Sequence, residues 1–275
     1  MNILFFGDIA GRAGRAALKK ALPRLKRKYK PDFIIANGEN IAHGLGVTKK
    51  TVSELLNLGI DLLTSGNHVF DKEEAKILLG DGETPLLRPL NYKGSRPGRG
   101  FSILTRGLRR LLVINLEGQI FMPEEFDHPF FSAEKILEKY GLGRAAALAG
   151  QERVDAILVD FHAEATSEKK MMGWLLDGRV SAVLGTHTHV QTNDERILPK
   201  KTAYISDVGM VGVEDSSLGV DFQTAVNCFL TNQPIKVRPA FGGPVEINAV
   251  LVKVEKNSGL AKSIVKIREK VLKYR

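Results

Sequence analysis

Short apolar runs of strand length alternate with longer stretches that repeat apolar residues at helical spacing in the first third of the chain. The predicted strand and helix pairs are, in order, Asn2–Phe6 and Arg12–Tyr29, Asp32–Ala36 and Thr48–Leu58, and Asp61–Thr64 and Lys72–Leu79. This alternation predicts βαβ units and therefore an α/β domain. Because proline has no backbone N–H to donate, Pro23 predicts a kink or a break near Leu22 in the first helix.

The pattern changes after Asn91–Gly100, the most loop-like segment of the chain. The apolar runs Phe101–Thr105 and Leu111–Leu116 flank a turn-like stretch, which predicts an antiparallel pair and therefore a mixed sheet. Further helices are expected at Ala133–Tyr140 and Ser167–Asp177, and further strands at Asp155–Phe161, Ala182–Leu184, Ala203–Ile205 and Ile247–Val254. The loop-like segment is too short to separate independent domains, so we expect one domain over residues 1–275.

Composition restricts the class of protein further. A chain of 275 residues can bury about 75% of its unfolded surface, and its one cysteine, Cys228, excludes a disulfide framework and a thiolate zinc site. Met1–Gly7 lacks the charged region and cleavage site of a signal peptide, and no apolar run approaches the ~18 residues of a membrane span. We therefore expect a cytoplasmic protein without a membrane-spanning segment.

The net charge is +9, with basic residues spread along the chain and over Lys253–Arg275 at its end. Such a balance favours anionic ligands such as phosphates or RNA, but it is also typical of solvated helix faces and a basic tail.

Candidate metal ligands follow the ends of the predicted strands. The first three strands lead into Gly7-Asp8, Gly38-Glu39-Asn40 and Gly66-Asn67-His68, and two later strands lead into His162 and into His187-Thr188-His189. In open α/β sheets ligands bind beyond the carboxyl ends of the strands, so these loops are expected to meet in one crevice. In extended backbone, residues two apart point to the same side, so His187 and His189 are expected to face one centre.

Each of these residues also has a structural explanation. Asp8 is a candidate cap for the first helix, and Glu39, Asn40 and Asn67 are typical turn residues. Five strand-end loops that each supply an oxygen or imidazole donor favour the functional interpretation of the set.

The donors contain no cysteine, and such a set suits manganese, iron or zinc. Seven donors exceed the needs of one tetrahedral ion but suit two ions, which can share a carboxylate. Glu39 is the candidate for that bridging carboxylate.

Three competing motifs fail. The glycine-rich run Gly7–Gly14 lacks both the phosphate-loop lysine and the dinucleotide spacing. His162-Ala163-Glu164 matches half of a zinc deaminase signature, but one cysteine cannot supply the other half. No Gly-x-Ser-x-Gly elbow occurs that would place a serine nucleophile.

The ordered motifs resemble those of calcineurin-like metallophosphoesterases, and in particular their YmdB-type branch. The resemblance rests on Gly7-Asp8, Asn37-Gly38-Glu39-Asn40, Gly66-Asn67-His68-Val69-Phe70-Asp71, Asp160-Phe161-His162-Ala163-Glu164 and Gly185-Thr186-His187-Thr188-His189. Two departures from the general superfamily pattern, Ala10 in place of a histidine and Glu39 in place of an aspartate, are similar to this branch.

The resemblance implies an α/β four-layer α/β/β/α sandwich of two mixed sheets, two iron or manganese ions, and activity on phosphodiesters, including cyclic nucleotides. It implies that Glu39 bridges the two ions. The ligands of one ion would be Asp8, Glu39, Asn40 and His189, and those of the other Glu39, Asn67, His162 and His187. His68 would donate a proton to the leaving oxygen after attack by metal-bound hydroxide, and histidine ordinarily titrates in the range suited to that role.

Two alternatives remain open at the level of sequence. One is a phosphomonoesterase acting on nucleotides or proteins, since the same metal pair serves both reactions. The other is a regulatory module that binds RNA or a protein and has weak activity, which the basic charge favours. Against the module, the chain contains no RNA-recognition motif. A homo-oligomer is compatible with the sequence, which determines no number of subunits.

Overall fold

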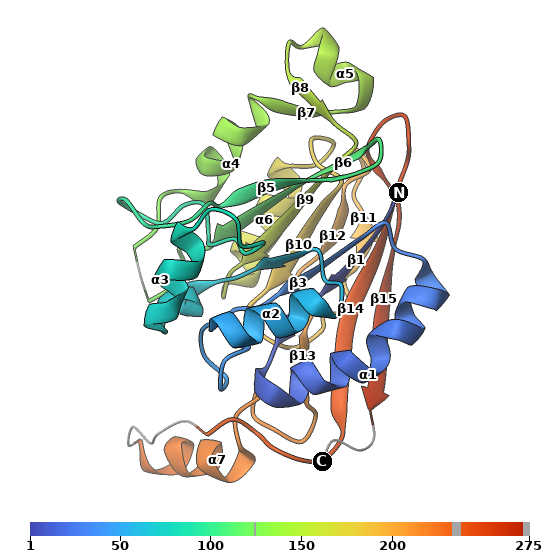
Figure 1. Cartoon of the computed structure of the whole chain (residues 1–275). Coiled ribbons are helices and arrows are strands. Elements are labelled where there is room, and N and C mark those ends of the chain that lie inside the picture. Colours follow the sequence, from blue (N-terminus) through green and yellow to red (C-terminus); the bar gives the residue numbers. More distant parts are fainter. Residues whose placement is uncertain (124, 233–237, 272–275) are drawn as a thin grey trace.

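The computed structural model describes residues 1–123, 125–232 and 238–271, which form two large mixed sheets, a two-stranded sheet and several helices (Figure 1). The first sheet has the order β2 (Asp8–Ile9), β13 (Met210–Val213), β14 (Val245–Val254), β1 (Asn2–Phe6), β3 (Phe33–Asn37) and β4 (Leu62–Thr64), with β15 (Ala261–Val271) against β14. The second has the order β11 (Arg196–Ile197), β12 (Ala203–Ile205), β10 (Ala182–Thr186), β9 (Ala156–His162), β6 (Arg109–Glu117) and β5 (Phe101–Arg106). The short pair is β7 (Tyr140–Leu142) and β8 (Glu152–Val154).

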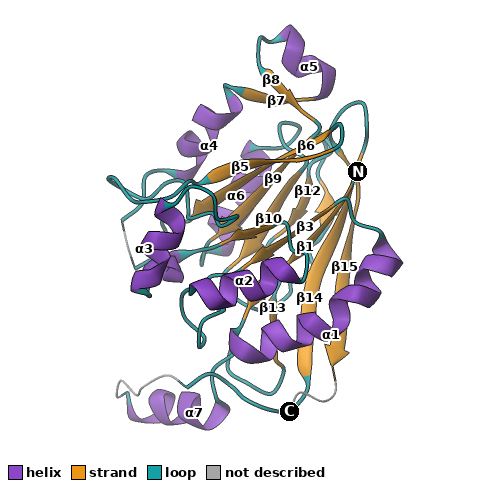
Figure 2. Ribbon diagram, viewed as in Figure 1, coloured by secondary structure: helices purple, strands orange, loops and turns teal. Residues whose placement is uncertain are grey.

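Helices cover the outer face of each large sheet, so the chain forms a four-layer α/β/β/α sandwich (Figure 2). One apolar core lies under α1 (Gly11–Tyr29), α2 (Lys49–Asn57) and α3 (Glu73–Gly80), and another under α4 (Pro129–Leu137) and α6 (Thr166–Leu175). The third core lies between the two sheets. The remaining helices are the 3₁₀ turn η1 (Asn67–Phe70), α5 (Gly143–Leu148) and α7 (Phe222–Thr231). This architecture confirms the predicted fold class.

The central strands are largely apolar because both of their faces are covered. Phe5 of β1 packs between the sheets, whereas its neighbour Phe6 packs under the helices. Each such side chain contributes about 1.5–3 kcal/mol when it is fully removed from water. The continuous runs are therefore typical of parallel strands within a sandwich.

Parallel pairing brings the carboxyl ends of the central strands to one edge of each sheet. In the first sheet β1 pairs in parallel with β3, and β3 with β4. In the second sheet β6 pairs in parallel with β9, β9 with β10, and β10 with β12. The loops that follow these strands therefore gather at these edges, as the sequence predicted.

The sequence predicts a kink or a break near Leu22, and the break is wrong, because α1 continues through Pro23 from Gly11 to Tyr29. Leu18, Leu22 and Leu25 are buried on both sides of the proline. Proline inside a helix costs ~3 kcal/mol or more. Burial of this apolar face against the first sheet offsets that cost.

The basic segment at the end of the chain is not only a tail, because it contains β15. This strand pairs antiparallel with β14 over residues 245–254 and forms an edge of the first sheet. Its sequence is rich in basic residues, which is typical of a solvated segment. Lys262, Arg268 and Lys270 are indeed exposed. Charged residues are common on edge strands, where they discourage pairing with other chains.

Helix α7, which includes Cys228, was also not predicted from the sequence. No helix among the described residues is long and apolar enough to cross a membrane.

Candidate metal centre

Polar side chains from both large sheets converge beyond the carboxyl ends of the central strands. Asp8 lies in β2, directly after β1, and Glu39 and Asn40 lie in the turn after β3. His162 is the last residue of β9, and His187 follows the last residue of β10. Because His162 contacts Glu39, the two sheets meet at this cluster.

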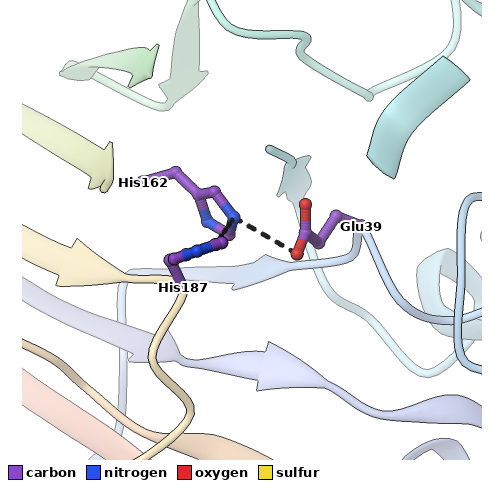
Figure 3. A group of neighbouring side chains, drawn as sticks. All are labelled: Glu39, His162 and His187. Atoms are coloured by element: carbon purple, nitrogen blue, oxygen red, sulfur yellow. Dashed lines mark hydrogen bonds and ion pairs between the residues drawn. The ribbon is translucent and has the colours of Figure 1, made fainter. Parts of the chain in front are cut away.

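Glu39 belongs to two groups of side chains that could each hold a metal ion. In the first group, ligand atoms of Glu39, His162 and His187 all lie within 4.8 Å of one another (Figure 3). Glu39 Oε1 lies 3.2 Å from His162 Nε2, and His187 Nδ1 lies 3.0 Å from the same nitrogen. Asp8, Glu39 and His189 form the second group. Two groups that share one carboxylate fit a pair of neighbouring metal ions.

Asn40 and Asn67 complete the predicted set of donors. Asn40 Nδ2 donates to Glu39 Oε1 at 2.9 Å and lies 3.3 Å from His189 Nε2. Asn67 begins η1, and the next backbone N–H, that of His68, donates to Glu39 Oε2 at 3.2 Å. The structure therefore brings the seven predicted donors to one edge of the sandwich.

Three of these donors have an oxygen atom with no internal partner, which tests whether the site fits metal ions. Asp8 Oδ1, Asn40 Oδ1 and Asn67 Oδ1 are buried and accept no hydrogen bond from any described residue. A buried polar atom left in this state costs about 1–3 kcal/mol. Carboxylate and amide oxygens are suitable metal ligands, so cations would satisfy all three atoms.

The charge around His162 supports the same interpretation. Burial raises the pKa of Asp8, raises that of Glu117 well above its ordinary value, and raises that of Asp160 to about 7. Burial alone would lower the pKa of His162, but the carboxylates of Glu39 and Glu117 raise it well above its ordinary value. The cluster has an excess of buried acid, which a positive centre would neutralise.

His187 and His189 each direct a ring nitrogen at the cluster. Burial and the neighbouring His162 lower the pKa of His187 to about 3, so its ring is neutral at physiological pH. His189 Nδ1 lies 3.0 Å from the carbonyl oxygen of Leu218, which leaves Nε2 to face the cluster. Burial opposes ionisation of Glu39, but the surrounding histidines hold its pKa below the ordinary value.

A buried network holds the ring of His162. His162 Nδ1 lies 2.9 Å from Thr186 Oγ1, and this hydroxyl donates to Asp160 Oδ1 at 2.7 Å. Asn37 Nδ2 donates to the other oxygen of Asp160 at 3.1 Å. With Nδ1 engaged, Nε2 is directed at Glu39. Such partners commonly orient metal-binding histidines.

The loop that carries His187 and His189 differs from the extended backbone that was predicted. β10 ends before it, and the two residues have φ angles of 101° and 64°. Thr188 between them donates from its N–H and its hydroxyl to Asp207 Oδ2, at 3.0 and 2.8 Å. Lys169 Nζ donates to the same oxygen at 2.8 Å. A buried ion pair therefore stabilises this loop, and the prediction that extended backbone brings the two histidines to one side is wrong.

His68 is more exposed than the other histidines of the site, with 34% of its side chain exposed against 21% for His187 and 12% for His189. Its Nδ1 lies 2.8 Å from Asp71 Oδ2, and its backbone N–H is held by Glu39. This arrangement leaves Nε2 directed away from Asp71.

Gly66 permits the close approach of the two sheets. A Cβ at this position would lie 2.2 Å from His162 Cδ2 and 2.4 Å from Glu39 Oε2. Any side chain here would therefore displace the cluster.

Comparison with known proteins identifies the family of this chain. Residues 4–267 match the family of YmdB-like proteins. The chain belongs to the YmdB-like family. It is 44% identical to a 2′,3′-cyclic-nucleotide 2′-phosphodiesterase of Bacillus subtilis over 97% of this chain and 96% of the relative.

Two solved structures resemble this YmdB-like protein over nearly their whole length. A protein from Thermus thermophilus has a TM-score of 0.88 at 39% identity and covers 98% of this chain and 99% of its own. A novel phosphatase from Mycoplasma pneumoniae has a TM-score of 0.88 at 30% identity and covers 99% and 94%. The predicted family resemblance is thereby confirmed.

Not every part of the YmdB-like site was foreseen. Glu117, at the end of β6, is fully buried, and neither carboxylate oxygen has a partner among the described residues. It lies opposite His162 in the parallel register of β6 and β9. The only signal in the sequence was its place at the end of an apolar strand.

The capping interpretation of Asp8 fails, because the N-cap of α1 is Ala10, with no side-chain hydrogen bond.

Proposed function

We propose that the protein is a dinuclear metal-dependent phosphodiesterase, a hydrolase of phosphoric ester bonds, that opens 2′,3′-cyclic nucleotides. The observation that carries the proposal is the pair of ligand groups that share Glu39, together with three buried oxygens that lack partners. The name of the Bacillus subtilis relative supports the substrate class.

In this proposal the two metal ions share the ligand Glu39. Asp8, Glu39, Asn40 and His189 would hold one ion, and Glu39, Asn67, His162 and His187 would hold the other. Iron or manganese suits these oxygen and nitrogen donors. When bound, such a pair lowers the pKa of water and neutralises charge on the phosphoryl oxygens.

The protein's own contribution to the chemistry centres on His68. In the reaction, water adds to phosphorus, the bond from phosphorus to the ribose 2′ oxygen breaks, and that oxygen takes up one proton. His68 Nε2 supplies this proton, while the contact of Nδ1 with Asp71 holds the ring in position. The product is a 3′-nucleotide.

The decisive experiment measures metal content by mass spectrometry and hydrolysis of 2′,3′-cyclic AMP on wild type and Glu39→Gln. This variant removes the shared charge with little change in shape. Metals supply several kcal/mol of charge stabilisation, so activity is expected to fall roughly 10³-fold or more, together with metal content. Glu152→Gln, on the exposed pair with Arg110, is the matched control and should retain both. A fully active, metal-free wild type would refute the proposal.

A phosphomonoesterase is the second candidate, supported by the phosphatase named among the solved structures. Rates on bis-nitrophenyl phosphate and nitrophenyl phosphate separate the two activities. A preference for the diester supports the phosphodiesterase. The third candidate, a regulatory module that binds RNA or a protein, would retain its binding in Glu39→Gln.

Location, domain organisation and assembly stay predictions. The single cysteine supports a cytoplasmic location. One domain over residues 1–275 and a homo-oligomer are likewise proposals, which limited proteolysis and light scattering can test.

A further inference from the structure

A cavity of about 860 Å³ is lined by residues of α1, of α2 and of the chain segments that precede α2 and β14. The two helices are neighbours, since Arg15 Nε lies 2.7 Å from Glu54 Oε2 and Lys26 Nζ donates to Leu58 O at 2.9 Å (Figure 1). The cavity lining includes Arg12, Lys19, His43, Lys50, Pro239 and Phe241. Its volume is within the range of nucleotide-sized ligand sites.

The cavity borders the loop that carries two of the proposed metal ligands. The backbone N–H of Gly11, at the start of α1, donates to the carbonyl oxygen of Asn40 at 2.9 Å. Arg15 Nη1 donates to the carbonyl oxygen of Ile41. Two residues later, the loop places the exposed His43 in the cavity wall. The cavity and the metal centre are therefore separated by one short loop.

The same loop also reaches the proposed proton donor. A Cβ at Gly46 would lie 3.3 Å from the carbonyl oxygen of His68. A Cβ at Gly44 would lie 3.2 Å from Pro239 Cγ, at the rim of the cavity. Residues 43–46 therefore lie between the backbone of His68 and the rim of the cavity.

The charges of the cavity are unbalanced. Arg12, Lys19 and Lys50 are exposed, and no described carboxylate lies within ion-pair distance of any of them. Glu54 is already paired with Arg15. The three cations favour an anion with several charges.

An aromatic ring accompanies these cations. Phe241 lines the cavity and is 69% exposed, next to Pro239 and Ala240. Basic residues that follow a phosphate backbone, combined with an aromatic side chain on which a base stacks, are typical of sites for single-stranded nucleic acid.

We propose that this cavity binds the phosphate backbone of single-stranded RNA whose 3′-terminal 2′,3′-cyclic phosphate occupies the metal centre. The inference rests on the proposed function, and it extends the substrate class from mononucleotides to RNA ends. Such ends arise when a ribose 2′ hydroxyl attacks the adjacent phosphodiester and expels the 5′ oxygen. Reactions of that class would supply the substrate.

The test compares two substrates, 2′,3′-cyclic AMP and a short single-stranded oligoribonucleotide that ends in a 2′,3′-cyclic phosphate. Lys19→Glu combined with Lys50→Glu is expected to lower kcat/KM for the oligonucleotide at least about tenfold and to leave that for the mononucleotide unchanged. The slope of log affinity against log salt should become shallower by ~0.7 for each phosphate that the variant no longer neutralises. Phe241→Ala should weaken binding of the oligonucleotide selectively, by about tenfold.

Lys253→Glu combined with Lys256→Glu is the matched control, because both lysines are exposed and lie in and beside the end of β14 away from the metal centre. It should leave both substrates unaffected. Equal effects of the two double variants, or equal losses on both substrates, would overturn the inference.

Direct binding separates failure of this inference from failure of the proposed function. Fluorescence anisotropy with an oligoribonucleotide ending in a 3′ phosphate reports on the cavity without any turnover. If wild type hydrolyses neither substrate but binds this RNA through Lys19 and Lys50, the proposed activity fails and the RNA site stands. If it hydrolyses 2′,3′-cyclic AMP but binds RNA no better than the Lys19 and Lys50 variant does, this inference alone fails. Equal competition by polyglutamate would indicate an acidic protein segment and would also overturn it.

Discussion

The two ends of the sandwich differ in how their charged side chains are placed, buried at one end and exposed in ion pairs at the other. At the end with the candidate metal centre, Asp8 and Glu117 are fully buried and keep carboxylate oxygens without partners among the described residues. At the other end, a cavity of about 940 Å³ is lined by arginines that extend into solvent. These arginines have carboxylate partners, as in the pairs Arg109–Asp32, Arg110–Glu152 and Arg153–Asp155.

This difference shows which kind of charged residue is evidence for a functional site. Exposed ion pairs contribute about 0–1 kcal/mol and need no further partner. Buried acids without partners are costly and persist only where something else compensates them. A cavity rich in paired arginines is therefore a weaker functional signal than a small cluster of buried, unsatisfied carboxylates.

The largest expected effect is on the rate of hydrolysis and follows from loss of proton transfer at the end with the candidate metal centre. His68→Ala removes the proposed proton donor, so kcat on 2′,3′-cyclic AMP should fall ~10²–10⁴-fold while metal content stays the same. Bis-nitrophenyl phosphate has a leaving group that needs no proton, so its hydrolysis should fall much less. Equal losses on the two substrates would show that His68 has another role.

Among these variants, the largest loss of stability should come from breaking the buried ion pair between Lys169 and Asp207, which holds the loop of His187 and His189. Lys169→Met leaves Asp207 buried without its cation, so the free energy of unfolding should fall by about 3–5 kcal/mol in urea denaturation. Arg110→Gln, which breaks an exposed pair at the other end, should change it by less than ~1 kcal/mol. Similar costs for the two variants would remove the contrast between the ends.

A smaller effect is expected from the orientation of His162. Thr186→Val removes the hydroxyl between His162 and Asp160, so metal affinity should fall about 10–100-fold in competition with a chelator. Thr202→Val is the control, since this buried threonine bonds to Val180 O, remote from the cluster. A normal affinity in the Thr186 variant would mean that packing alone orients the ring.

The smallest expected effect is a pH dependence of stability that arises from Asp194, in the loop after His189. Partial burial opposes ionisation of Asp194, but hydrogen bonds from Ser206 and Thr192 lower its pKa below the ordinary value. Its stabilisation is therefore present above the unfolded pKa and is lost as pH falls through the folded pKa. Asp194→Asn should cost no more than about 1 kcal/mol at neutral pH, and the difference from wild type should vanish in acid.

The fold could be predicted where local pattern and packing agree. The runs that form β1, β3 and β9 are apolar because both faces of the sheets are covered, and their bounds agreed with prediction within one or two residues. The sequence failed at Pro23 and at β15, where burial of a helix face and pairing with β14 outweigh local preference.

The sequence by itself determined which chemical groups gather at the site, because the donor residues follow the carboxyl ends of strands and parallel pairing brings those ends together. Only the tertiary structure decided how they are held. Glu117 has no recognisable motif, and the left-handed backbone of His187 and His189 depends on Asp207 and Lys169. The physical reason is distance along the chain. Burial, ion pairing and unsatisfied oxygens arise from contacts between segments far apart in sequence, and periodicity reports only on neighbours.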